Sequence, residues 1–109
     1  MLIAWVECQV KREKRAEFVR TAENFVARLR QVSGCVECNL MMDCEVRGLY
    51  TLLSKWEAAG PLRLFLESNE FRALLGTRIL LRDPPRVNVD EVLRRVRVSS
   101  RGDDIRLRW

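Results

Sequence analysis

The fold is decided by the stretch Leu49-Tyr-Thr-Leu-Leu-Ser-Lys-Trp56. Side chains alternate along a strand with a period of two, so its even-numbered residues share one face and its odd-numbered residues the other. Both sets contain large apolar residues. We therefore expect a strand that its own domain covers on one side and that needs a second cover on the other.

Three further elements precede this strand. Residues 35–42 alternate in the same way, and residues 43–48 make the turn between the two strands. From about Glu13 to Val32 the apolar residues recur at steps of three and four, with Gly34 just past the end, which predicts an amphipathic helix. Its apolar stripe consists of Phe18, Ala22, Phe25, Leu29 and Val32. Residues 2–10 alternate again and predict the first strand.

A second helical region and a fourth strand follow. Gly60-Pro61 favours a helix start, because the backbone N–H that proline lacks would have no hydrogen-bond partner in the first turn of a helix. Ser68 can cap a further stretch, which ends at Asp83-Pro84-Pro85. The inward stripe of that stretch is Phe71, Leu74, Leu75, Arg78 and Ile79. Val87 and Val89 begin the fourth strand, and the tail beyond it predicts an added basic hairpin or edge strand.

This order of strand, helix, strand, strand, helix, strand is a split βαβ unit repeated once. In such an arrangement both helices lie on one face of an antiparallel sheet. We therefore expect an α+β fold of ferredoxin-like topology. At 109 residues the chain has room for one core, so we expect one domain over residues 1–98, with residues 99–109 as its basic C-terminal extension.

The face of the sheet away from the helices is too apolar to remain in water on a monomer. This face would carry Ile3, Trp5, Met41, Leu49 and Leu53. A second copy of the same sheet is the simplest cover. We therefore expect a homodimer that forms through this face.

The positive charge is concentrated at the C-terminal end. Of the net +5, residues 94–109 hold +4, since six arginines there are offset only by Asp103 and Asp104. We expect this tail to be an edge element rather than a nucleic-acid site. Arg47-Gly48 matches the start of the signature strand of RNA-recognition modules, but leucine and threonine follow where stacking aromatic residues are needed. We therefore expect no nucleic-acid partner.

The chain shows no targeting or membrane segment. No stretch is apolar over the ~20 residues that a membrane span needs, and the first ten residues lack the features of an export signal. We therefore expect a cytoplasmic protein without membrane contact, in which all four cysteines stay reduced.

Cys35 and Cys38 have the spacing of a zinc or redox motif, which Cys8 and Cys44 could complete to four ligands. Residues i and i+3 of a strand point to opposite faces, so we expect Cys35 and Cys38 not to converge and no metal to bind. Histidine is absent from the chain. Its absence excludes Ser/His and Cys/His nucleophile pairs and haem ligation by imidazole.

Three motifs resemble the antibiotic biosynthesis monooxygenase family. They are Ser33-Gly34-Cys35 after the long helix, Tyr50-x-Leu52-x-Ser54-x-Trp56, and Leu66-x-Ser68-x-x-Phe71. The spacing agrees over about residues 2–98. The resemblance implies a dimer of the α/β-barrel type, in which two sheets meet and each subunit keeps a pocket between its sheet and its helices. Some members of that family oxygenate phenols or quinols without a cofactor, and others degrade haem.

The resemblance also implies site residues. Trp56 matches the tryptophan that lines the family pocket, and Phe65 and Phe71 lie on the stretch that covers it. Haem-degrading relatives carry a histidine where this chain has Leu66, so haem cleavage is not expected. Quinone-forming relatives carry an asparagine where this chain has Leu52, and Ser54 replaces a common glutamate. The expected substrate pocket comprises Trp56, Tyr50, Ser54, Leu52, Phe65, Leu66, Phe71 and Arg78.

Two functions are compatible with these residues. One is a monooxygenase that acts on an aromatic or quinol-like small molecule without a cofactor, and for which no catalytic base is identified. The other is a non-catalytic dimeric module of the same fold that binds a small apolar ligand or serves as a structural partner.

Overall fold

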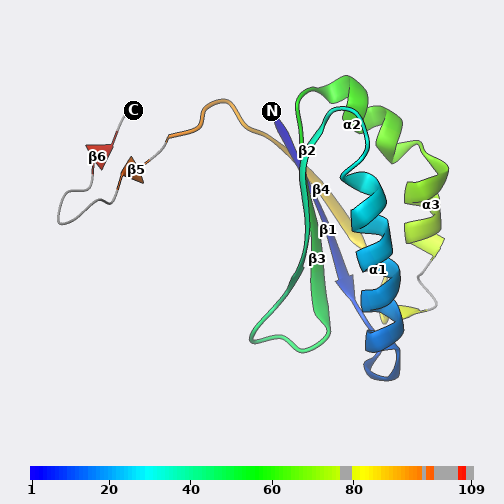
Figure 1. Ribbon diagram of the computed structural model, residues 1–109. Coiled ribbons are helices and arrows are strands. Elements are labelled where there is room, and N and C mark those ends of the chain that lie inside the picture. The colour runs from blue at the N-terminus through cyan, green and yellow to red at the C-terminus, as the bar shows by residue number, and fades with distance from the viewer. Residues whose placement is uncertain (77–79, 97, 100–105, 108–109) are drawn as a thin grey trace.

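The computed structural model describes residues 1–76, 80–96, 98–99 and 106–107. Its main part is a four-stranded sheet with helices on one face (Figure 1). The elements of this part are β1 Leu2–Gln9, the 3-10 turn η1 Arg12–Lys14, α1 Arg15–Leu29, β2 Cys35–Met42, β3 Leu49–Trp56, α2 Ala59–Leu66, α3 Asn69–Leu75 and β4 Arg86–Glu91. Two short strands follow, β5 Val98–Ser99 and β6 Arg106–Leu107.

The strand order β2-β3-β1-β4, antiparallel throughout, confirms the ferredoxin-like α+β fold. β3 lies in the interior of the sheet, paired with β1 on one side and with β2 on the other. Its register places Tyr50 opposite Cys8 and Ser54 opposite Ala4. All four of these side chains are buried on the helix side, as the alternation predicts.

The core lies between this face and the helices. α1 buries one residue about every turn, at Phe18, Ala22, Phe25, Val26 and Leu29. The ring of Phe18 contacts that of Tyr50 at 5.1 Å, which joins the first half of α1 to β3. Trp56, at the end of β3, is completely buried.

The first helix is shorter than the prediction of about 13–32. It begins after the 3-10 turn and ends at Leu29. Gln31 and Val32 donate their backbone N–H groups to the carbonyls three residues earlier, at 3.0 Å each, so the chain tightens there into a turn. Gly34 completes the turn at φ +89°.

The second helical region is divided at Ser68, as its capping role predicts. The Ser68 hydroxyl accepts a hydrogen bond from the Phe71 N–H at 3.1 Å and donates to the Phe65 carbonyl. One side chain therefore closes α2 and opens α3. α3 ends at Leu75, and the expected inward residues Arg78 and Ile79 lie outside the described residues.

The predicted opposition of Cys35 and Cys38 is wrong. A β-bulge interrupts β2, because Cys35 pairs with Trp56 and Glu37 with Lys55, which leaves Val36 as an extra residue. Cys38 pairs with Ser54, so both cysteines fall on the helix side of the sheet. Uninterrupted alternation would have separated them. Cys8 and Cys38 are buried, as expected, and Cys44 is exposed.

The tail forms a hairpin instead of an edge strand of the main sheet. β5 pairs with β6 in a separate two-stranded sheet, with Val98 opposite Leu107. Of the residues predicted to alternate along the tail, Ile105 and Trp109 lie outside the described residues. None of the described helices is both long and apolar enough to cross a membrane.

We predict that Gly34→Ala destabilises the protein by about 2 kcal/mol or more. A β-carbon there would collide with Cβ of Pro61, and the left-handed backbone adds roughly 1–2 kcal/mol for a residue other than glycine. Gly60→Ala is the matched control, because a β-carbon added there would meet no heavy atom within 4 Å and alanine favours a helix. Urea unfolding would measure both, and equal stability of the two variants would contradict the prediction.

Candidate functional site

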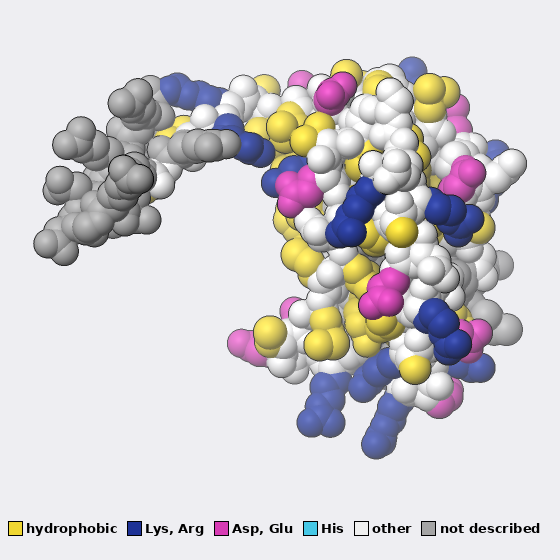
Figure 2. Space-filling view, in the orientation of Figure 1, with side chains coloured by type: hydrophobic (Ala, Val, Ile, Leu, Met, Phe, Trp, Pro, Cys, Tyr) yellow, Lys and Arg dark blue, Asp and Glu magenta, His cyan; other side chains and the backbone are white. Residues whose placement is uncertain are grey.

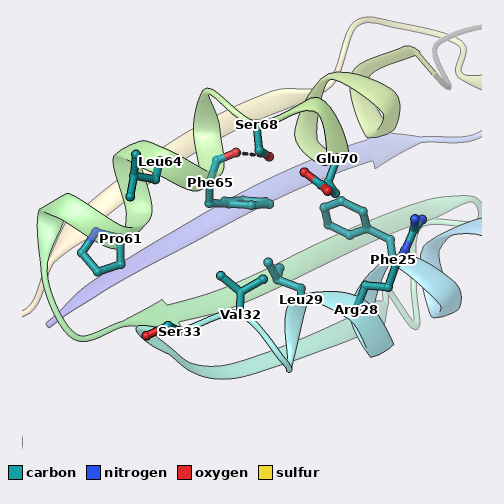
Figure 3. A pocket seen from close by; sticks show the side chains of 10 residues that line it. All are labelled: Phe25, Arg28, Leu29, Val32, Ser33, Pro61, Leu64, Phe65, Ser68 and Glu70. Carbon is teal, nitrogen blue, oxygen red and sulfur yellow. Dashed lines mark hydrogen bonds between the residues drawn. The ribbon is translucent and has the colours of Figure 1, made fainter.

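A cavity of about 460 Å³ lies between α1 and the pair α2 and α3 (Figure 3). This volume falls within the range of about 300–1,000 Å³ that is common for small-molecule sites. Most of its walls are apolar. The lining residues are Phe25, Arg28, Leu29, Val32, Ser33, Pro61, Leu64, Phe65, Ser68 and Glu70.

Helical spacing brings the two walls together. One wall comes from Phe25, Arg28 and Leu29, which share one face of α1, and from Val32 in the turn that follows the helix. The opposite wall comes from Pro61, Leu64 and Phe65 of α2. The close approach of Gly34 to Pro61 holds the two walls together at one end.

The cavity has polar groups near its margins. Ser68 is already engaged by Phe65 and Phe71, so its hydroxyl is committed to the backbone. Arg28 and Glu70 extend from α1 and α3 toward the same end of the cavity (Figure 3). Ser33 lies at the other end, beside Pro61. The arrangement suits a molecule that is mostly apolar and carries a polar group at one end.

Behind the cavity lies a cluster of aromatic rings that shares Phe65 with it. Phe65 stacks on Trp56 at a centroid distance of 5.1 Å and meets Phe71 edge-on at 5.2 Å. The indole N–H of Trp56 donates to Ser54 Oγ at 2.9 Å. This bond satisfies the N–H donor of a fully buried side chain, so it can remain in the core without a large penalty.

The structure brings most of the sequence-predicted pocket residues together as packed side chains. Trp56, Tyr50, Ser54, Leu52, Phe65 and Phe71 are buried, and Leu66 packs against them partly buried. Among these residues Phe65 alone also lines the cavity described above. Arg78 lies outside the described residues.

The α1 wall was not predicted from the sequence as part of a site. Phe25, Leu29 and Val32 were part of the predicted apolar stripe, but nothing in the stripe distinguishes a residue that faces a cavity from one in the core. The position of Arg28 in the sequence could have identified it as a site residue, because it lies three residues after Phe25 and four before Val32 on the same helix face. Such a cation at the margin of an apolar stripe is a candidate for ligand binding.

The buried thiols are poor nucleophiles. Burial raises the pKa of the Cys8 thiol from its ordinary 9.0 to about 11. Burial, followed by the nearby Cys35, raises the pKa of Cys38 to about 12, although Arg30 opposes the shift. Burial also raises the pKa of Cys35. Near neutral pH the buried Cys8 and Cys38 are therefore protonated thiols, which are poor nucleophiles.

The residues present do not fit a metal ion or haem. Within residues 1–76, 80–96, 98–99 and 106–107, no three His, Cys, Asp or Glu side chains are grouped so that they could hold a metal ion. The whole chain lacks the histidine that haem ligation by imidazole requires. Leu66 stands at the position where the haem-degrading pattern needs that histidine.

Together these features define a ferredoxin-like α+β domain with an apolar cavity on the helix side. Several solved structures share the fold. A protein from Deinococcus radiodurans, provisionally named an antibiotic biosynthesis monooxygenase, superposes with a TM-score of 0.85 at 15% identity, over 92% of this chain and 100% of its own. A conserved protein from Methanosarcina mazei Go1 gives 0.75 at 23% identity, over 83% of this chain and 91% of its own.

A further structure, named as an antibiotic biosynthesis monooxygenase, gives a TM-score of 0.77 at 18% identity and covers 86% of this chain and 100% of its own. Among curated proteins, none matches the sequence significantly. The family model for antibiotic biosynthesis monooxygenase matches residues 1–76, which is most of the chain. The chain belongs to the antibiotic biosynthesis monooxygenase family.

We predict that Trp56→Ala lowers the free energy of unfolding by about 3–5 kcal/mol, because it empties a fully buried site. Leu64→Ala should change it by less than about 0.5 kcal/mol, since Leu64 is 72% exposed on the cavity wall. Urea unfolding of both variants would measure the difference. A stable Trp56→Ala protein would show that the indole lines open space and is not part of the packed core.

Proposed function

We propose that this protein binds a small aromatic molecule in the cavity between α1 and α2 and oxygenates it without a cofactor. The observation that carries the proposal is the cavity itself, with Phe25 and Phe65 in its walls and Arg28 at its margin. The family membership supports the reaction type, since the family is named for monooxygenases.

The chemistry then depends on the substrate as the reductant. An easily ionised phenol or quinol loses a proton, and its anion can pass electrons to O₂. One oxygen atom of O₂ bonds to a ring carbon and becomes a carbonyl oxygen. The other leaves as water with the two hydrogens that the substrate loses. The substrate supplies all four electrons, so the balance requires no further reductant.

The residues of this chain would serve that chemistry by binding and charge stabilisation. The walls formed by Phe25 and Phe65 hold an aromatic ring away from water, and the guanidinium of Arg28 stabilises the developing anion. Glu70 at the same end is the carboxylate that can take the proton. The aromatic cluster around Trp56 gives the Phe65 wall its rigidity.

A second candidate is a non-catalytic module that binds the same kind of ligand. It is favoured by Leu52, Ser54 and Leu66, which replace the polar residues of active relatives and lie in or against the core. The two candidates differ in turnover and not in binding.

We also propose that the protein is cytoplasmic. Its four free thiols would suit a reducing compartment.

We also propose that two chains pair through the face of the sheet away from the helices, called the outer face. It carries the alternate residues of the strands, Ile3, Trp5, Leu49, Leu53 and Met41. Met41 is exposed and the others are half-buried. The indole N–H of Trp5 is inaccessible to solvent and has no hydrogen-bond partner among the described residues. A second copy would remove this apolar surface from water.

We predict that phenols or quinols raise the melting temperature of the protein and are turned over faster as pH rises, because only the deprotonated substrate reduces O₂. Arg28→Gln should weaken binding of the anionic form by about three- to tenfold. Arg20→Gln, an exposed change on the same helix away from the cavity, is the control. Thermal shift and oxygen consumption would measure both effects, after exhaustive removal of metals and flavin.

Binding without turnover would favour the non-catalytic module. Neither binding nor turnover with any acidic phenol or quinol would contradict the proposal.

We predict that Leu53→Asp dissociates the dimer, since it places a carboxylate in the middle of the outer face. Leu64→Asp, the same change on the helix side, should leave the dimer intact. Sedimentation at micromolar concentration would distinguish a 12.8 kDa monomer from a dimer of twice that mass. A wild-type protein that sediments only as a monomer would refute the pairing.

A further inference from the structure

The chain leaves the sheet after β4 and turns away from its own body. The Val92 N–H donates to the Met1 carbonyl at 2.8 Å, which extends the ladder between β4 and β1 by one bond. The following residues, 93–96, adopt no regular secondary structure, and the side chain of Leu93 is 91% exposed. We call residues 92–96 and 98–99 the arm.

The arm extends to the side of the sheet opposite the helices, which is the side of the outer face (Figure 1). Figure 2 shows a recess between the arm and the body, with hydrophobic side chains gathered along the body below it. The arm itself exposes Leu93 and Val98. The arm therefore exposes these two apolar side chains beside an apolar face, although it also carries the exposed Arg94 and Arg95.

The strand register places the root of the arm near one end of the outer face, because Glu91 at the end of β4 lies opposite Leu2, and Lys55 lies opposite the neighbouring Ile3. Glu37 on β2 forms an ion pair with Lys55 at 2.9 Å and accepts a hydrogen bond from Asn39. Lys55 holds the pKa of the Glu37 carboxyl below its usual value, and Arg95 of the arm acts more weakly in the same direction. Arg95 is thus close enough to the outer face to influence it.

The arm adds apolar surface beside the outer face. Leu93 is 91% exposed and Val98 is 49% exposed, so packing them on a partner would remove more apolar surface from water than the sheet face alone.

We propose that the arm clasps a second copy of this chain, docked on the outer face, by packing Leu93 and Val98 against the partner. The inference rests on the proposed dimer and adds that each chain holds the other from outside the sheet. A two-fold axis makes the two arms equivalent, so each arm contacts the partner within the same dimer. No unpaired arm surface is left to bind a third chain.

A nucleic acid is the other occupant that a basic arm could bind. The outer face argues against it. Besides Lys55 and Arg86 this face carries Glu7, Glu37 and Asp90, and its centre holds the apolar Trp5 and Leu53. A 91% exposed leucine also contributes nothing to phosphate binding, whereas it fits an apolar protein partner.

The test compares full-length variants by sedimentation over a concentration series. Leu93→Asp should weaken the dimer by about tenfold or more, because each dimer contains the change twice. Val98→Asp should act in the same direction. Leu64→Asp, a change of the same kind at another exposed leucine, should leave the dissociation constant unchanged. Since Leu93 and Leu64 are both exposed, all these chains are expected to fold, and urea unfolding would verify this.

If Leu53→Asp gives monomers while Leu93→Asp and Val98→Asp dimerise as tightly as the wild type, the dimer stands and the clasp is refuted. If the wild type itself is monomeric, both proposals fail. Tight, salt-dependent binding of a uridine oligonucleotide that is lost when Arg94 and Arg95 are changed to Gln would also overturn the clasp, and would assign the arm to nucleic acid.

Discussion

The ring of Phe65 holds the helix side of the molecule together. It stacks on Trp56 of β3, contacts Phe25 of α1 at 5.9 Å, and meets Phe71 of α3 edge-on. One side chain thus connects the sheet to three helices. The same ring forms part of the cavity wall, so the position of the wall is determined by the packing behind it. A displacement of any of the three neighbouring rings would be transmitted directly to the site.

The alternation in the strands was sufficient to predict the sheet, the helix side and the buried face of β3, because a period of two leaves few other arrangements. It could not predict the bulge at Val36, since one inserted residue reverses the faces without changing composition. The cavity was predictable only in part. Phe65 was named from its motif, but the distance between α1 and α2 depends on the contact of Gly34 with Pro61, which no local pattern encodes.

The two faces of the sheet follow different physical constraints. The helix side is closed by aromatic and aliphatic packing, and its few polar groups, such as the Ser54 hydroxyl, are paired internally. The outer face mixes apolar residues with the Glu37–Lys55 ion pair at one end. Such a face can be buried against a like surface of a second chain, whereas the helix side is already buried within one chain.

The bulge in β2 also affects how the protein behaves in a crowded solution. β2 is an edge strand, and a regular exposed edge can add strands from other molecules and begin aggregation. The extra residue at Val36 interrupts the row of backbone donors and acceptors and bends the strand. This edge is therefore a poor template for the addition of strands from other molecules.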